Sequence, residues 1–215
     1  LYMRTSLWTS LVKNIRENQG KKEKLKFFEI AKVYYEQRAN LPKEIYKLGV
    51  AVNTSFADLK GIVEALLGEF NIEDYKVGKS SVHIFSPNVQ AEIIISRIIC
   101  HLGQLKQQLQ SKNSLKKPVF LAEIDIQALA DNYRSVSSYK PINPYATIKL
   151  DLTKKIDNFE KFKENAYKTS KLLDKLELVD VFKDKVTIRF YFSAKKRNLT
   201  ETEAQKELKK IEEAS

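Results

Sequence analysis

The spacing of apolar residues predicts two amphipathic helices in the first part of the chain. The first has Leu7, Leu11 and Ile15 on one face, and Thr5 or Ser6 can cap it. The second follows Asp58 as its cap and places its apolar residues on one side, namely Leu59, Ile62, Val63, Leu66, Leu67 and Phe70. Each helix is therefore expected to pack its apolar face on a core.

Runs of aromatic and β-branched residues predict antiparallel strands around these helices. Strands are expected over residues 25–35, 46–52 and 118–126, and a short helix over 127–132. Residues 91–102 leave two interpretations open. A helix is possible, whereas the isoleucines favour strands, and Ser96 with Arg97 could turn a hairpin.

The C-terminal segment has a clearer pattern, which predicts the order strand, helix, strand, strand, helix. The strands are expected over residues 145–152, 176–182 and 185–193. Asp157 with Glu160 marks the start of the first helix, and Thr200 with Glu203 forms a capping box for the second. This order is that of a split β-α-β, ferredoxin-like fold without its last strand. Such a fold covers one sheet face with two helices and leaves the other face open.

A polar, proline-bearing stretch separates the two segments. Pro141 and Pro144 interrupt regular structure, and Ser137 with Ser138 adds turn-forming residues. We therefore expect an α+β protein in three parts. These are an antiparallel-sheet module over residues 1–135, a linker over 136–144, and a ferredoxin-like (RRM-like) α/β sandwich over 145–215.

The open sheet face of the second domain is the candidate binding site. RNA-recognition modules stack bases on aromatic side chains of this face. Alternation places Lys149, Arg189 and Tyr191 there, with Tyr145 at the entrance of the first strand. A second interpretation stays open, because an exposed sheet face is also polar when it contacts only water.

Three more basic residues precede the last helix. Lys195, Lys196 and Arg197 could hold a phosphate near the N-terminus of that helix, where the helix dipole favours anions. A solvated cluster at the end of a hairpin explains them equally well. A phosphate site and a solvated cluster therefore both remain open.

The net charge of the chain favours a polyanionic partner such as RNA or DNA. The 215 residues carry 38 basic and 27 acidic side chains, a formal charge of +11. The last 84 residues hold an excess of six basic side chains and the first 131 an excess of five. The excess of basic residues per residue is therefore larger in the C-terminal part. We interpret much of the charge of the first 131 residues as keeping that module soluble.

Composition also bounds the class of protein. With 43% hydrophobic residues the chain can bury a core, which excludes wholesale disorder. The apolar runs fall short of the roughly 18 residues of a membrane span, and Arg4, Lys13 and Arg16 argue against a signal peptide. The single cysteine, Cys100, indicates a reducing compartment, so we expect a cytoplasmic protein without membrane contact.

The residues give little sign of catalysis or metal binding. Cys100 and His101 are adjacent, and neighbours in a strand point to opposite faces, so they cannot easily share a substrate or an ion. His83 is the only other histidine, so a zinc site lacks ligands. The six glycines form no phosphate-binding loop. We therefore expect no catalytic residue, no metal ligand and no cofactor in this chain.

Five segments in the same order resemble the beta subunit of bacterial-type phenylalanine–tRNA ligase. Residues 3–7 with 11–13 and Asn18 are similar to that family's LRTSLLPGLLK…N segment, and residues 28–34 to its FEIGRVF strand. Residues 56–61, with Glu64, Leu66 and Leu67, resemble its DLKGxVExLL helix. Residues 141–152 have the spacing of PISKFPAVRRDL, and residues 197–200 resemble RTLTDEE.

The resemblance implies a role in attaching phenylalanine to tRNA. Residues 1–135 would belong to a catalytic-like but inactive class II module, and the later part to a ferredoxin-fold anticodon-binding domain. Implied partners are tRNA and the alpha subunit, in an alpha2-beta2 heterotetramer whose alpha subunit uses ATP and magnesium. Family members carry further N-terminal domains, so we expect the chain to be a fragment.

Two other functions are weighed against this one. The chain could be an interaction module that holds a multisubunit assembly together with little direct RNA contact. An independent enzyme is disfavoured, because no paired acid–base spacing is visible.

Overall fold

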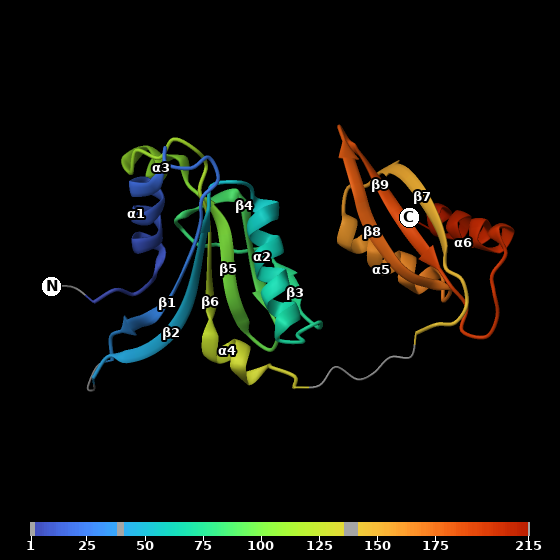
Figure 1. Cartoon of the computed structure of the whole chain (residues 1–215), viewed down its shortest axis with the longest axis horizontal. Helices are drawn as coiled ribbons and strands as arrows, with labels where there is room; N and C mark the ends of the chain where they lie inside the picture. Colours follow the sequence, from blue (N-terminus) through green and yellow to red (C-terminus); the bar gives the residue numbers. More distant parts are fainter. Residues whose placement is uncertain (1–2, 38–40, 136–141, 215) are drawn as a thin grey trace. The chain divides into compact units, whose positions relative to one another are not determined.

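A computed structural model describes residues 3–37, 41–135 and 142–214. The chain divides into two compact units, Leu1–Ser138 and Tyr139–Ser215 (Figure 1). Each unit has its own hydrophobic core. The expected linker over 136–144 falls partly on residues 136–141, which lie outside the described ranges, and residues 142–144 form neither helix nor strand.

The first unit combines a six-stranded sheet with four helices among its described residues. Its elements are α1 (Trp8–Asn18), β1 (Lys26–Tyr35), β2 (Lys43–Val52), α2 (Phe56–Glu69), β3 (Lys76–Gly78), β4 (Phe85–Ile94), β5 (Ile98–Leu105), α3 (Gln107–Lys112), β6 (Phe120–Asp125) and α4 (Ile126–Asp131). The sheet order is β1-β2-β6-β5-β4-β3, and all pairs are antiparallel.

The two faces of this sheet are covered by different helices. Val50 and Val52 of β2 pack in one core with the apolar face of α2, whereas Ala51 packs in a second core with α1. Successive strand residues point to opposite faces, so α1 and α2 lie on opposite sides of the sheet. Helix α1 approaches closely at Gly49, where an added Cβ would lie 2.6 Å from Leu11 Cδ1.

The structure settles the ambiguous stretch and corrects both predicted caps of this unit. Neither Thr5 nor Ser6 caps α1: its N-cap is Leu7, and no side chain there makes a capping hydrogen bond. Residues 91–102 form the β4–β5 hairpin, with bends at 95–97, so the helix interpretation is wrong. The predicted cap of α2 was Asp58, but Ser55 is the N-cap and its side chain accepts a hydrogen bond from the Asp58 N–H. Ser55 has the extended backbone that an N-cap requires, whereas Asp58 already lies in the first turn.

The second unit has the predicted element order. It contains β7 (Ile148–Lys155), α5 (Phe159–Thr169), β8 (Leu173–Phe182), β9 (Lys185–Phe192) and α6 (Glu201–Glu213). The strands form an antiparallel sheet in the order β7-β9-β8. Both helices contribute to one core with the apolar side of this sheet, and Ile188, Phe190 and Phe192 of the central strand are fully buried there. The ferredoxin-like assignment stays a prediction.

Local boundaries in this unit differ from those expected. Strand β7 begins at Ile148, because Tyr145 lies in a turn in which its N–H bonds the Asn143 side chain. The cap of α5 is Asn158, not Asp157, and Asn158 accepts a hydrogen bond from the Lys161 N–H. The capping box of Thr200 and Glu203 on α6 is confirmed.

None of the helices in the described ranges combines the length and the apolar character that a bilayer span requires.

We predict that Gly103→Ala destabilises the first unit. Gly103 lies on β5 under the ring of Phe85, and an added Cβ would lie 2.6 Å from Phe85 Cγ. Overpacking of this kind costs about 1–3 kcal/mol of unfolding free energy. Trp8 is the only tryptophan and its ring packs 5.3 Å from that of Phe85, so its fluorescence in a urea titration reports the loss.

Gly61→Ala is the control for this prediction. Gly61 lies in the exposed part of α2 with open space around it, so alanine should raise the stability by about 0.5–1 kcal/mol. Equal urea midpoints for the two variants would contradict the close contact between Gly103 and the Phe85 ring on which the prediction rests.

Candidate nucleic-acid interface

The sheet of the second unit leaves one face free of helices. Residues of β9 alternate between the core and this open face, which carries Lys185, Thr187, Arg189 and Tyr191. Strands β7 and β8 flank β9, and both helices lie on the opposite side (Figure 1). Sheet geometry thus presents a regular array of side chains to solvent.

Strand register arranges the open face in four rows. Partners in an antiparallel pair lie on the same face, so each β9 residue forms a row with its two neighbours. The rows are Lys149–Tyr191–Lys175, Asp151–Arg189–Glu177, Thr153–Thr187–Asp180 and Lys155–Lys185–Phe182. The face therefore has a basic and aromatic row at each end and carboxylates between them.

Tyr191 is the centre of the first row. The Nζ atoms of Lys149 and Lys175 lie 5.5 and 5.6 Å from the centroid of its ring. Its hydroxyl donates to a carboxylate oxygen of Glu177 at 2.6 Å, and this bond raises the pKa of Tyr191. Hydrogen bonds from Lys175 and then Tyr191 lower the pKa of Glu177. The ring is thereby fixed in orientation while it remains partly exposed.

Arg189 is engaged by a carboxylate of the neighbouring strand. Its Nε and Nη2 atoms donate to the two oxygens of Asp151 at 2.8 and 2.7 Å. This bidentate pair raises the pKa of Arg189 and lowers that of Asp151. Alternation in the sequence predicts Arg189 on the open face, where it lies, but does not predict that its charge is balanced there.

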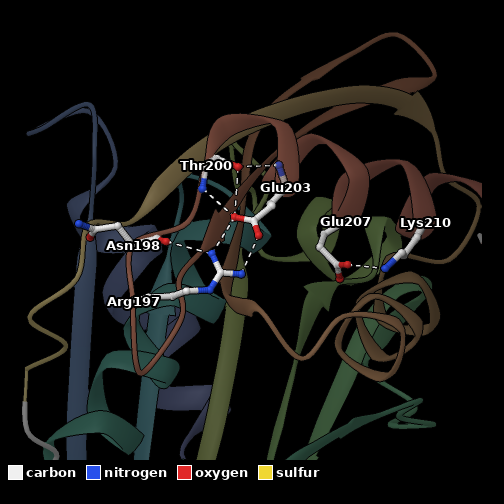
Figure 2. Close-up of polar contacts among 6 residues, drawn as sticks. All are labelled: Arg197, Asn198, Thr200, Glu203, Glu207 and Lys210. Carbon is white, nitrogen blue, oxygen red and sulfur yellow. Dashed lines mark hydrogen bonds and ion pairs between the residues drawn. The ribbon is translucent and has the colours of Figure 1, made fainter.

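The three basic residues predicted in the loop between β9 and α6 differ in their contacts. Figure 2 shows Arg197 against Glu203, where Nη1 and Nη2 donate to the two carboxylate oxygens at 2.9 and 2.6 Å. Glu203 also accepts from the Thr200 N–H at 2.9 Å and closes the capping box. Arg197 therefore anchors the start of α6, whereas Lys195 and Lys196 are exposed in the loop.

Tyr145 lies apart from the strand residues. It precedes β7 by three residues and is only half buried. The next residue, Ala146, donates its N–H to the Asn198 side chain at 3.0 Å, which ties this segment to the loop that carries Lys195 and Lys196. Lys149 and Tyr191 are thus paired in one row, and Arg189 lies in the next row. The remaining predicted residues, Tyr145, Lys195, Lys196 and Arg197, lie outside the strands.

Phe182 is an open-face residue that sequence reasoning missed. Its side chain is 68% exposed and is paired in register with Lys185. Simple alternation from the buried Leu176 puts Phe182 on the core side, but a register shift between Leu178 and Asp180 moves it to the open face. The one local signal at that shift is Asp180, whose side chain accepts a hydrogen bond from the Val181 N–H.

The first unit contains a separate cleft of about 760 Å3 on the α1 side of its sheet, lined by both apolar and polar side chains. Glu123 and His101 line this cleft, and burial is the main cause that raises the pKa of the first and lowers that of the second. Glu123 accepts a hydrogen bond from the Leu7 N–H at 2.7 Å. Cys100 points to the opposite core, where burial raises the pKa of its thiol. Within the described ranges no three His, Cys, Asp or Glu side chains gather as a metal site.

The first unit matches a known protein family. Residues 1–126 match the family model described as the phenylalanyl tRNA synthetase beta chain CLM domain.

Curated relatives extend this similarity beyond residue 126. The chain is 28% identical to a phenylalanine–tRNA ligase beta subunit of Clostridium acetobutylicum, over 85% of the chain and 24% of that protein. It is 28% identical to the beta subunit of Fusobacterium nucleatum, over 94% of the chain and 29% of that protein. The chain thus spans about a quarter of the length of these relatives.

Solved structures show a related fold. A pyrrolysyl tRNA synthetase of Desulfitobacterium hafniense aligns with a TM-score of 0.50 at 16% identity, covering 59% of this chain and 47% of that one. At this identity the likeness concerns the fold alone.

We predict that Glu203→Gln weakens α6 in a pH-dependent manner. Arg197 and the Thr200 N–H lower the pKa of Glu203 from an ordinary value of 4.5 to about 2. Its contribution to stability is therefore present above pH about 4.5 and is lost as the pH falls toward 2. Thermal denaturation followed by circular dichroism should give a lower melting temperature for Glu203→Gln at pH 7, with the difference shrinking across that window.

Glu201→Gln is the matched control, because Glu201 lies in the same first turn but does not close the capping box. If both variants lose the same stability at every pH, the specific pairing of Glu203 is refuted.

Proposed function

Because the chain belongs to the phenylalanyl tRNA synthetase beta chain CLM domain family, we propose that it is a non-catalytic part of a phenylalanine–tRNA ligase beta subunit. Its first unit contacts the catalytic alpha subunit, and its second unit binds the anticodon region of tRNA through the open sheet face. The reaction, ATP-dependent attachment of phenylalanine to tRNA, takes place in the alpha subunit with magnesium. The assembly is an alpha2-beta2 heterotetramer in the cytoplasm, and the second unit is a ferredoxin-like domain.

The Lys149–Tyr191–Lys175 row carries the RNA-binding part of this proposal. A partly exposed aromatic ring on an open sheet is a stacking surface for an unpaired base. Lys149 and Lys175 hold their ammonium groups beside that ring, where the phosphates that flank a stacked base would lie. Lys175 is also paired with Glu177, so Lys149 is the more available of the two for a phosphate. Tyr191, Lys149 and Lys175 therefore combine the two contacts that a single-stranded loop requires.

The row with Phe182 provides a second stacking surface on the same face. Tyr191 and Lys185, the neighbour of Phe182, are six residues apart on β9, which corresponds to about 20 Å of extended strand. Lys155 and Lys185 share this row. The separation suits contact with different bases of one loop rather than with a single nucleotide.

The carboxylates between these rows favour recognition of bases over simple phosphate binding. Asp151 and Glu177 accept hydrogen bonds, and carboxylates pair with the exocyclic amino groups of bases. They also repel phosphate, so a purely electrostatic surface would not contain them. Arg189 holds Asp151 in place and acts as a positioning residue in this scheme.

An apolar groove supports contact of the first unit with a protein partner. Phe28 and Ile30 of β1 are 75% and 57% exposed, and they line a groove of about 470 Å3 beside α2. Exposed apolar side chains that gather in this way mark interaction surfaces. The same groove favours the alternative function, an interaction module of a multisubunit assembly with little direct RNA contact.

We predict that Tyr191→Ala and Phe182→Ala each weaken tRNA binding. Loss of one base–aromatic stack costs about 1–3 kcal/mol, so the dissociation constant should rise roughly 5- to 150-fold in fluorescence anisotropy titrations. Tyr167→Ala is the control, because Tyr167 is an exposed aromatic residue of α5 in the helix layer.

A comparison of binding to different tRNAs distinguishes anticodon recognition from the interaction-module function. Anticodon recognition requires tighter binding to phenylalanine tRNA than to other tRNAs, and Tyr191→Ala and Arg189→Ala should reduce that preference. Equal affinity for every tRNA, unaffected by these variants, would refute the anticodon role and leave the interaction module.

We predict that Phe28→Asp with Ile30→Asp prevents co-purification of the chain with the alpha subunit. Both side chains are exposed, so the fold should persist while the apolar contact is lost. Leu41→Asp, in the β1–β2 turn and 87% exposed, is the control. Unchanged co-purification of the double variant in a pull-down would exclude this groove as the contact.

A further inference from the structure

Five exposed lysines gather at one corner of the first unit. Lys21, Lys22 and Lys24 lie between α1 and β1, and Lys116 and Lys117 lie between α3 and β6. We call these five residues the lysine corner. The two segments are more than ninety residues apart in the sequence, so their proximity is a product of the fold.

Hydrogen bonds hold the two segments together. The Gln19 side chain donates to the Ser114 carbonyl at 2.7 Å and accepts from the Lys116 N–H at 2.9 Å. Lys117 Nζ donates to the Glu23 carbonyl at 3.2 Å. The neutral amide of Gln19 thus fixes the backbone of both segments without adding a negative charge, whereas Lys117 is also paired with the Glu23 carboxylate at 3.7 Å.

A buried asparagine, Asn53, binds the backbone at the end of the first segment. Asn53 accepts from the Leu25 N–H at 2.7 Å and donates to the Glu23 carbonyl at 3.2 Å. Two crevices, of about 380 and 570 Å3, adjoin this asparagine, and lysines of both segments line them. The corner is therefore a hollowed basic surface on an ordered backbone.

The corner contains most of the excess charge of residues 1–131. The first 131 residues have five more basic than acidic side chains, and the five lysines with Glu23 account for an excess of four. Neighbouring Lys26 is balanced by Asp58 at 2.7 Å. If these lysines only kept the unit soluble, their charge would be expected to be spread over its surface. Their clustering at one corner therefore requires a different explanation.

The residue types at the corner define the ligand. Lysine ammonium groups are point charges that suit phosphates, and the two segments carry no aromatic residue for base stacking. Among the described residues, none of the exposed large hydrophobic side chains belongs to residues 19–24 or 114–118. Binding to a lipid surface by insertion would need such side chains, so a nucleic-acid backbone fits better.

We infer that the lysine corner binds the phosphate backbone of RNA, independently of base sequence. The choice of tRNA as that RNA rests on the proposed function, whereas the basic surface itself does not. The first unit then contributes to RNA affinity, and the open face of the second unit contributes selectivity.

The test compares two variants of the whole chain with the same change in net charge. One has Lys21, Lys22, Lys116 and Lys117 replaced by Gln, and the other has the exposed Lys13, Lys43, Lys76 and Lys79 replaced by Gln. Anisotropy titrations with phenylalanine tRNA at several salt concentrations give the dissociation constant and its salt slope. The corner variant should bind at least tenfold more weakly at low salt, with a slope smaller by about 2–4. The control variant should change its slope by less than about one.

Several outcomes would overturn the inference. These are equal losses in the two variants, an unchanged salt slope in the corner variant, and loss of binding to phosphatidylserine vesicles with tRNA binding intact. Trp8 fluorescence and circular dichroism confirm that both variants fold. Tyr191→Ala separates this inference from the proposed function, because it should weaken binding without a change in slope. If Tyr191→Ala has no effect while the corner variant behaves as described, the anticodon role fails and the corner stands.

Discussion

Pairing of β6 between β2 and β5 is the interaction on which the first unit depends. Strand β6 joins the β1–β2 hairpin to the β4–β5 hairpin, and each residue from Phe120 to Ile124 is buried. Both faces of the strand are covered because α1 and α2 pack on opposite sides of the sheet. The surfaces proposed to bind partners consequently lie at the periphery of this unit, at the groove beside β1 and at the lysine corner.

In the second unit the sheet has helices on one face only. Its apolar side chains gather on the helix side, with Phe190 and Phe192 fully buried, and every polar position of β9 is turned outward. A three-stranded sheet with a rigid core behind it can hold an aromatic ring such as Tyr191 at a fixed position. The one-sided cover is thus what makes the open face suitable for recognition.

Alternation along single strands was enough to predict part of the open sheet face. It placed Lys149, Arg189 and Tyr191 on the open face because β7 and β9 pair without a register shift. It failed at Phe182, because a register shift in β8 depends on pairing with β9 and not on the local sequence. Partners such as Asp151 and contacts such as Gln19 with Ser114 join distant segments, so one sequence without its fold cannot predict them.

Ion pairs with carboxylates engage all the arginines of the described residues and some of the lysines, such as Lys26, Lys117 and Lys175. Each arginine there has a carboxylate partner, namely Arg4, Arg16, Arg97, Arg134, Arg189 and Arg197 with Glu29, Glu17, Asp125, Asp74, Asp151 and Glu203. A planar guanidinium suits such fixed pairs, whereas flexible lysines adapt to a ligand. The paired arginines therefore stabilise the structure, and in the proposed function the lysines of the corner and of the open face contact the polyanion. Because affinity that depends on lysines falls with salt, that proposal assigns selectivity to Tyr191, Phe182 and the carboxylates between them.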